Sequence, residues 1–355
     1  MEYRHIKDID LAANINNRVF AIFLARDVDI RTQKDGKTKY INVNLCDRDF
    51  KIDAKKFGAT DSEIETMKNG GVYRGAIDIK EYAKSSTGYS CIIYNFEPHN
   101  EPASAFVEWS DGVNWAQEII QKTLNELTES IYGGITAKLI IEKWDKFSSW
   151  SAASSFHHDC MGGLLVHTAE VIRQASDIGD LWEEKYGPGF INRPLLLAGA
   201  LLHDIGKVEE LKVSVDSGTT EYSNKASLET HITIGVSMID VEAYKLGLGY
   251  PISHTVDEVS NELNDEEESK TEERIQFERE AISLLKHCIL SHHGKKEFGS
   301  PIEASCPEAT IINIADGLSA DMYRYNKAFN KMESGTSSTV WSGGAMVVTY
   351  KDSLK

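Results

Sequence analysis

The sequence predicts a protein of two parts, a small β-barrel followed by a larger helical domain. The chain of 355 residues is long enough for two domains. Apolar and polar residues alternate along short segments of the first hundred residues, whereas apolar residues recur at helical spacing beyond residue 111. The charge divides in the same way. Residues 1–100 carry 16 basic against 15 acidic residues, and the remainder carries 22 against 40.

The first part shows a pattern of short strands. The segments that alternate are 19–24, 40–45, 72–77 and 91–96. About five short strands within about 100 residues fit a small closed barrel, for which the OB-fold is one candidate. Four aromatic residues are candidates for stacking on nucleobases: Tyr40, Phe50, Tyr73 and Tyr94. Position by position, we favour the simpler interpretation that they are ordinary strand or core residues.

The second part is predicted to be all-α. Residues 101–130 are expected to form a linker and a connecting helix, and residues 131–330 the helical domain. The helical segments are 164–178, 194–205, 231–246, 280–291 and 311–329. An acidic stretch at about 253–276 lacks an apolar stripe, which predicts a solvated insertion. Residues 331–355 form a C-terminal tail to which the pattern assigns no role.

Composition excludes several classes of protein. A net charge of −17 argues against tight binding to a polyanion. The longest apolar run, residues 195–202, is too short to cross a membrane, and residues 1–5 do not open a secretory signal. Five scattered cysteines without a C-x-x-C pair favour a reducing setting. We therefore expect a cytoplasmic protein with no membrane partner.

Histidines and aspartates stand on or at the ends of apolar helices. These candidate metal ligands are His167, His203, Asp204, His231, His292, His293 and Asp316. Each one alone has an ordinary explanation as a hydrogen-bonded core residue or a helix cap. Their coincidence is harder to explain in that way, because every buried imidazole or carboxylate needs a partner. A shared metal centre would pair all of them at once.

These positions match the H…HD…D signature of the HD-domain metal-dependent phosphohydrolases. The surrounding residues are closer to one branch of that superfamily. They are FHHDCMGGLLVHT at 156–168, LLHDIGKVEEL at 201–211 and ILSHHGKKEFGSP at 289–301. The chain therefore resembles the YhaM-like 3′→5′ exoribonucleases, in which an N-terminal OB-fold precedes the HD domain. One departure is Ser319, which stands where the family pattern repeats an aspartate.

The resemblance implies two divalent metal ions and a metal-activated water that attacks phosphorus. One ion would be held by His167, His203, Asp204 and Asp316, and the second by Asp204, His231 and one or both of His292 and His293. A histidine-rich site with carboxylates favours transition metals over magnesium. We expect manganese first, with iron, cobalt, nickel or zinc as alternatives.

In addition to Asp204, three residues are candidate catalytic residues. Lys207 lies three positions after Asp204 and could reach a phosphate oxygen, although it could equally be an exposed residue after a helix end. His157 and His158 could contact the substrate, protonate the leaving group or form a structural pair.

The resemblance implies hydrolysis of single-stranded RNA, or of DNA, from its 3′ end to nucleoside 5′-monophosphates. The near-neutral barrel would bind the strand with modest affinity. Two alternatives stay open. One is an HD phosphohydrolase of small nucleotides, such as cyclic dinucleotides or nucleoside triphosphates, with a regulatory barrel. The other is a nucleic-acid-binding protein whose HD domain is inactive. The oligomeric state is not indicated.

Overall fold

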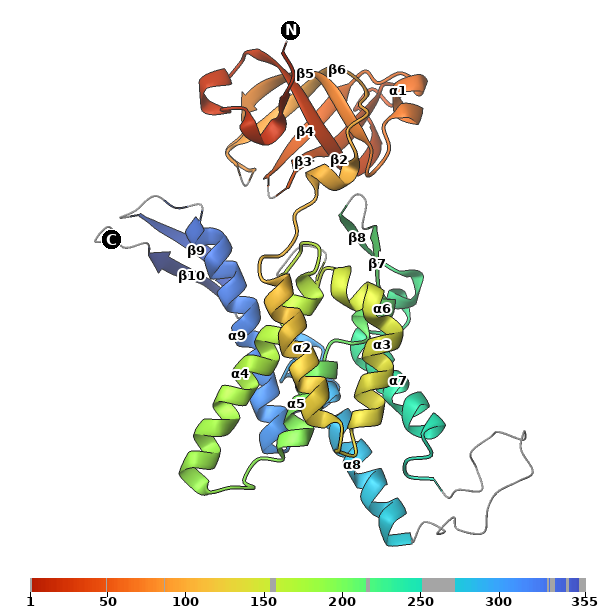
Figure 1. The fold of residues 1–355 in the computed structure, drawn as a ribbon. Helices are drawn as coiled ribbons and strands as arrows, with labels where there is room; N and C mark the ends of the chain where they lie inside the picture. Colours follow the sequence, from red (N-terminus) through yellow and green to blue (C-terminus); the bar gives the residue numbers. More distant parts are fainter. Residues whose placement is uncertain are drawn as a thin grey trace, which may run out of the picture. The chain divides into compact units, whose positions relative to one another are not determined.

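The computed structural model describes residues 2–48, 50–85, 87–153, 158–214, 218–250, 272–330, 332, 336–342 and 345–350. The chain divides into two compact units. One consists of Met1–Trp109 with Val213–Thr219, and the other of Ser110–Lys212 with Thr220–Lys355. The first is a β-barrel and the second is mainly helical, so the predicted fold class is confirmed (Figure 1).

The barrel consists of one sheet closed on itself. Its strands are β1 (Arg4–His5), β2 (Arg18–Thr32), β3 (Lys39–Asp47), β4 (Phe50–Phe57), β5 (Val72–Glu81) and β6 (Tyr89–Pro98). The strand order is β1-β2-β3-β4-β6-β5, and β2 also pairs with β5, which closes the barrel. A short helix, α1 (Asp61–Thr66), joins β4 to β5. The five strands β2 to β6 in this order, with α1 between the third and fourth of them, form the Greek-key barrel of the OB-fold.

Alternation along the strands places one face of each strand inside the barrel. In β4 every second side chain from Ile52 to Lys56 is buried. Of the four aromatic residues considered for stacking, Tyr73 lies in the barrel core beside Phe23, so it is a core residue. Tyr94 is 59% exposed, and the Arg18 guanidinium lies 3.8 Å from the centre of its ring. The simpler interpretation therefore holds for Tyr73.

The segment after β6 differs from the expected linker. Residues 103–106 form the 3₁₀ helix η3 (Ala103–Phe106), and the Phe106 side chain is fully buried against Leu24 and Cys46 of the barrel. The backbone N–H of Arg48 donates to the Phe106 carbonyl at 2.8 Å. Burial of this aromatic ring attaches the segment to the barrel up to Trp109.

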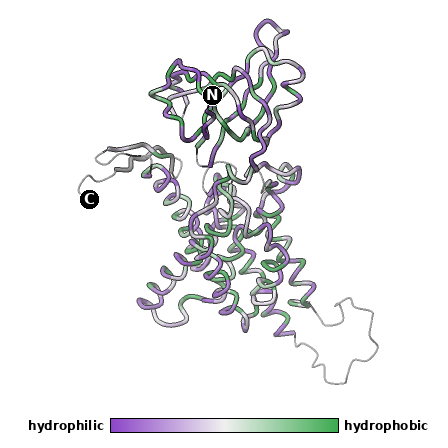
Figure 2. The backbone as a smooth tube through the Cα atoms, turned by 45° about the horizontal axis from the view of Figure 1, so that its top comes forward, coloured by the Kyte–Doolittle hydropathy of each residue, from purple (hydrophilic) through white to green (hydrophobic). Residues whose placement is uncertain are grey.

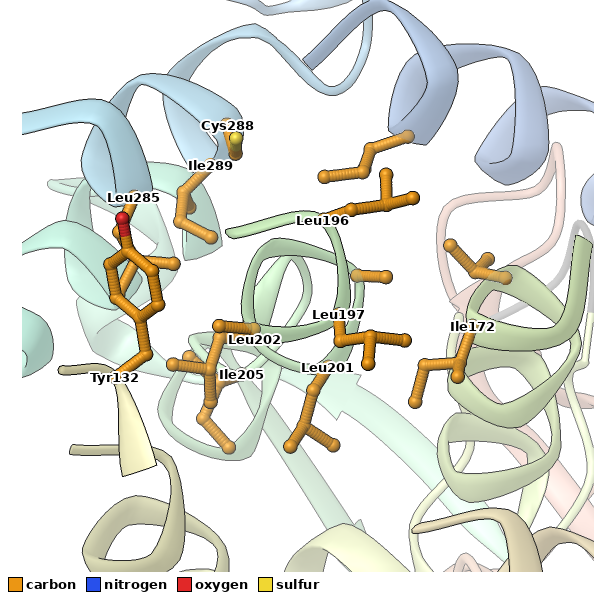
Figure 3. Packing of buried hydrophobic residues seen from close by; sticks show 14 of the residues in the cluster. Tyr132, Ile172, Leu196, Leu197, Leu201, Leu202, Ile205, Leu285, Cys288 and Ile289 are labelled. Atoms are coloured by element: carbon orange, nitrogen blue, oxygen red, sulfur yellow. The ribbon is translucent and has the colours of Figure 1, made fainter. Parts of the chain in front are cut away.

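The helical unit is built around one helix that is buried on nearly all sides. Its helices are α2 (Val113–Leu127), α3 (Gly133–Ser149), α4 (Gly163–Tyr186), α5 (Arg193–Leu202), α6 (Lys207–Glu210), α7 (His231–Lys245), α8 (Glu272–Ser291) and α9 (Pro307–Asn330). Every residue of α5 from Leu195 to Leu202 is buried. Figure 3 shows α5 leucines surrounded by side chains such as Ile172 of α4 and Leu285 of α8. Apolar stretches of the chain run through this packed region (Figure 2).

The chain beyond residue 110 also contains short strands that the all-α prediction omits. Strands β7 (Leu211–Ser214) and β8 (Thr219–Tyr222) pair with each other, as do β9 (Ser337–Ser342) and β10 (Ala345–Tyr350) in the predicted tail. Most of the predicted acidic insertion lies outside the described residues, and residues 272–276 begin α8. Among the helices that the structure describes, none combines the length and apolar character needed to cross a bilayer.

One close approach of backbones depends on glycine. The sequence places Gly206 just after a helix end, and the structure places it at the start of α6, with α5 ending at Leu202. A Cβ atom on Gly206 would lie 2.0 Å from the carbonyl oxygen of His231, the first residue of α7. Glycine therefore lets the turn that carries Asp204 lie directly against the start of α7.

We predict that Gly206→Ala lowers the free energy of unfolding by about 1–3 kcal/mol, because the new methyl group must displace backbone. Gly317→Ala is the matched control, since it lies in α9 and a Cβ atom added there would meet no neighbouring atom within 4 Å. It should instead raise the free energy of unfolding by about 0.5–1 kcal/mol, through helix propensity. Urea denaturation followed by circular dichroism measures both. Equal effects of the two substitutions would contradict the close approach.

Candidate metal centre

The seven predicted ligands converge in the helical unit, although they come from widely separated segments. His167 lies on α4, His203 and Asp204 follow α5, His231 begins α7, His292 and His293 follow α8, and Asp316 lies on α9. The potential ligand atoms of six of them form two groups, in each of which all atoms lie within 4.8 Å of one another. The members are His167, His203 and Asp204 in one group, and His231, His292 and His293 in the other.

Asp204, a member of the first group, also faces the second, with one oxygen toward the imidazoles of each group. Its Oδ2 is 3.4 Å from Nε2 of His167 and 3.5 Å from Nε2 of His203. Its Oδ1 is 3.5 Å from Nε2 of His231 and 3.7 Å from Nε2 of His292. This carboxylate therefore has the geometry of a bridge between two sites.

Asp316 adds a second carboxylate to the first group, from α9. Its Oδ1 lies 3.2 Å from Nε2 of His167 and 4.0 Å from Nε2 of His203. The two imidazole Nε2 atoms are themselves 3.2 Å apart. Two nitrogens and two carboxylates thus face a common point, as the resemblance implies.

Three of the imidazoles are oriented by backbone carbonyls. Nδ1–H of His203 donates to the Ala200 carbonyl at 2.8 Å, and Nδ1–H of His292 donates to the Ile289 carbonyl at 2.7 Å. Nδ1–H of His293 donates to the carbonyl of Phe298 at 2.9 Å. A proton on Nδ1 leaves Nε2 with its lone pair, which is the form that binds a metal.

The other two imidazoles are oriented by side chains. His231 Nδ1 lies 3.0 Å from Oε2 of Glu210, whose Oε1 also accepts the backbone N–H of His231 at 2.8 Å. His167 Nδ1 lies 2.8 Å from the Ser319 hydroxyl, which donates to Glu170 at 2.7 Å. The hydroxyl therefore accepts from His167 and passes the hydrogen bond on to a carboxylate. Such supporting groups fix the ring and raise its basicity.

Several buried atoms at the centre lack a hydrogen-bond partner among the described residues. Oδ1 of Asp204, Nε2 of His231 and Nε2 of His292 make no hydrogen bond within the described ranges, although each is inaccessible to solvent. A buried polar atom without a partner costs about 1–3 kcal/mol. Nitrogen and carboxylate donors in this arrangement suit a divalent transition metal, so the residues present fit the implied ions.

The electrostatics of the centre keep the carboxylates ionised. Burial alone would raise the pKa of Asp204, but the Lys207 cation, with Nζ 2.6 Å from Oδ2, and the His203 ring hold it well below its usual range. Burial likewise opposes the charge of His167, yet the Asp204 and Asp316 carboxylates raise its pKa to about 9. In the absence of metal, cations therefore balance the acidic groups.

The three further candidate catalytic residues, Lys207, His157 and His158, differ in position. Lys207 is only 7% exposed and pairs with Asp204, so the idea of an exposed residue after a helix end is wrong for it. His158 is buried, with Nε2 3.4 Å from Oε2 of Glu170 and its ring stacked on Tyr323 at 4.3 Å. His157 lies outside the described residues.

Sequence reasoning missed the supporting residues Glu170, Glu210 and Ser319. Of the three, only Ser319 carries a sign of this role in the sequence, because it departs from the family pattern. The structure places it against His167. Glu170 and Glu210 carry no separate signal, because a glutamate on a helix is ordinarily a solvated residue.

A barrel of OB type followed by a helical unit with this ligand set defines an HD-domain protein, and the HD domain model matches residues 164–321. The 3′-5′ exoribonuclease YhaM of Listeria innocua is 31% identical over 319 residues, which are 86% of this chain and 85% of that protein. The proteins of the same name from Bacillus velezensis and Bacillus subtilis are each 27% identical. They cover 90% and 83% of this chain, and the same shares of their own lengths. The chain belongs to the family of YhaM 3′-5′ exoribonucleases.

We predict that Ser319→Ala weakens binding of Mn²⁺ by about 10–100-fold, because His167 loses the acceptor that orients its ring. Isothermal titration calorimetry with MnCl₂ measures the affinity. Ser237→Ala on α7 is the matched control, since that exposed hydroxyl donates only to the carbonyl of Thr233 among the described contacts. Unchanged affinity in Ser319→Ala would contradict the supporting role.

Proposed function

We propose that this protein is a metal-dependent 3′→5′ exonuclease that hydrolyses single-stranded RNA, or DNA, to nucleoside 5′-monophosphates. The observation that carries the proposal is Asp204, whose two oxygens face two separate groups of imidazoles. The relatives named as 3′-5′ exoribonucleases support the choice of a polynucleotide substrate. Residues 131–330 would carry the hydrolytic centre, and residues 1–100 would bind the strand.

The ligands divide into two sets. His167, His203, Asp204 and Asp316 would hold one divalent ion, and Asp204, His231, His292 and His293 the other. Bound there, two such ions, with manganese first and iron, cobalt, nickel or zinc as alternatives, would supply a metal-activated water and neutralise phosphate oxygens. The hydrogen bonds at Nδ1 hold the imidazoles in place before substrate arrives, so little reorganisation is needed.

Two residues beside the ligands would act on the phosphate and the leaving group. Burial opposes the charge on Lys207, but Asp204 outweighs it and raises the pKa of the ammonium, so the lysine stays a cation. Its Nζ would bind a non-bridging phosphate oxygen. His158 Nε2, held near the Glu170 carboxylate, would transfer a proton to the departing 3′ oxygen. His157 stays a candidate catalytic residue to which we assign no specific role.

A groove on the barrel suits a single strand of nucleic acid. It has a volume of about 400 Å³ and is lined by residues of β3, β4, β5 and β6 and by Tyr82. Two aromatic side chains, Phe57 and Tyr82, are nearly half exposed there, and Lys55 and Lys80 line the same groove. Exposed rings beside cations are the combination that binds unpaired bases and their phosphates.

We further propose a cytoplasmic location. All five cysteines lie in the described part of the chain and are free thiols. Four of them are buried, as expected of core thiols in a reducing compartment.

The first test of function uses single-stranded RNA labelled at its 5′ end. With Mn²⁺, we expect a ladder of products shortened from the 3′ end. We expect Asp204→Ala to reduce the rate by at least about 100-fold, because the bridge between the two groups is lost. A chelator should stop wild-type turnover, and added Mn²⁺ should restore it.

Alternative substrates decide between the remaining hypotheses. Turnover of cyclic dinucleotides or nucleoside triphosphates without shortening of RNA would contradict the exonuclease and favour the small-nucleotide phosphohydrolase. RNA binding without any Mn²⁺-dependent hydrolysis, and with the same affinity in Asp204→Ala, would favour the inactive HD domain. Parallel reactions with labelled DNA determine which strand is preferred.

The second test concerns the barrel. We expect Phe57→Ala with Tyr82→Ala to raise KM for long RNA by about tenfold and leave kcat unchanged, because stacking in the groove is lost. Hydrolysis of bis-p-nitrophenyl phosphate, which has no strand to bind in the groove, should be unaffected. Tyr94→Ala is the control, because Tyr94 is an exposed aromatic of the same barrel that does not line the groove. A similar increase in KM for Tyr94→Ala would contradict the choice of groove.

A further inference from the structure

A second pocket lies in the helical unit, beside the metal centre. It has a volume of about 420 Å³ and is lined by residues of α2, α4 and α9. Its lining residues are Trp115, Glu170, Arg173, Gln174, Met322, Tyr323 and Asn326. This volume lies within the range of about 300–1,000 Å³ that is typical of small-molecule sites. The residues proposed as metal ligands are not among those that line it.

The pocket is linked to the metal centre by two short contacts. Glu170, on its wall, accepts from the Ser319 hydroxyl that holds His167. Tyr323, also on its wall, stacks on His158, whose ring centre lies 5.2 Å from that of His167. A group bound in the pocket would therefore contact residues that themselves contact the metal centre.

The chemistry of the lining is that of a nucleobase site. Trp115 and Met322, which line the pocket, are 40% and 48% exposed, although both are large apolar residues. Together with Tyr323 they offer flat or soft apolar surfaces on which a base can lie. Gln174 and Asn326 add carboxamides, which can pair with the donors and acceptors of a base edge.

One atom of the lining lacks a partner. The carbonyl oxygen Oε1 of Gln174 is inaccessible to solvent and makes no hydrogen bond to the described residues. Buried polar atoms are rarely left without a partner unless a ligand or water supplies it. Because Gln174 lines the pocket, rotation of its carboxamide would bring this oxygen to an amino group of a nucleobase bound there.

We propose that this pocket binds the nucleobase of the 3′-terminal nucleotide while the adjacent phosphate lies at the metal centre. This inference rests on the proposed exonuclease function. The base lies against Trp115 and Tyr323, and its edge pairs with Gln174. Since stacking accepts every base, the pocket accepts all four, and Gln174 sets a preference for bases with an amino group. Removal of each terminal nucleotide then places the next base in the same pocket.

The test compares two RNA oligonucleotides that differ only at the 3′-terminal nucleotide, which either carries its base or is abasic. We expect wild-type kcat/KM to be about tenfold lower on the abasic end, mainly through KM. Trp115→Leu should lower kcat/KM about tenfold on the natural end and leave it unchanged on the abasic end. Gln174→Met should lower it severalfold for terminal adenosine or cytidine and less for uridine.

Matched variants and a small substrate complete the design. Trp182→Leu and Gln121→Met remove the same residue types from α4 and α2 outside the pocket, and both should behave as wild type. All variants should hydrolyse bis-p-nitrophenyl phosphate at the wild-type rate, because this activated diester needs only the metal centre. Adenosine 5′-monophosphate should quench tryptophan fluorescence in wild type but not in Trp115→Leu, and a ribose phosphate without a base should quench neither.

Two results would overturn the proposal. One is a wild-type enzyme that is indifferent to the abasic end, and the other is an equal loss on both ends in Trp115→Leu. If RNA is not shortened at all while adenosine 5′-monophosphate still binds through Trp115, the exonuclease function fails and the base pocket stands. If RNA is shortened without regard to the terminal base, only the pocket assignment fails.

Discussion

The structure of the helical unit depends on the burial of one carboxylate, that of Asp204. A charge removed from water must be matched by other charges or by metal. Here Lys207 and four imidazoles surround it, and each imidazole is itself fixed through Nδ1. The turn that carries Asp204 can lie there because α5 is buried along its length and because Gly206 allows contact with α7. The apolar core and the polar centre thus constrain the same short segment.

The ligand set could be predicted from sequence because its members interrupt apolar patterns. An imidazole or carboxylate within or directly after a buried helix is conspicuous, and His203 with Asp204 directly follows α5, which is buried from Leu195 to Leu202. Most of the barrel strands could be predicted for a similar reason, although the pattern does not single out β4. The apolar periodicity predicts that α8 and α9 begin later in the sequence than they do, because the polar residues of their first turns carry no apolar repeat.

What the sequence could not predict lies in contacts between distant helices. Ser319 and Glu170 meet across 149 positions of the chain, and nothing local marks either as the support of His167. Lys207 has the sequence context of a solvated residue, and only its neighbours in the structure show that its ammonium balances a buried carboxylate. The same holds for the pocket beside Tyr323, whose lining combines three helices. Periodicity indicates which face of a helix is buried, and not which partner that face meets.

The histidine ligands are of two kinds, which differ in the group that accepts a hydrogen bond from Nδ1 of the imidazole. His203 and His292 are oriented by carbonyls three residues earlier in the chain, which any residue at that position would provide. His231 is supported by the carboxylate of Glu210, and His167 by a hydroxyl that leads to Glu170. Each group of ligands therefore contains one imidazole whose electron donation is set by an acidic side chain and at least one whose donation is set by backbone. Evolution can adjust the electron donation of either group of ligands by changing one glutamate or serine while the geometry of the remaining ligands is preserved.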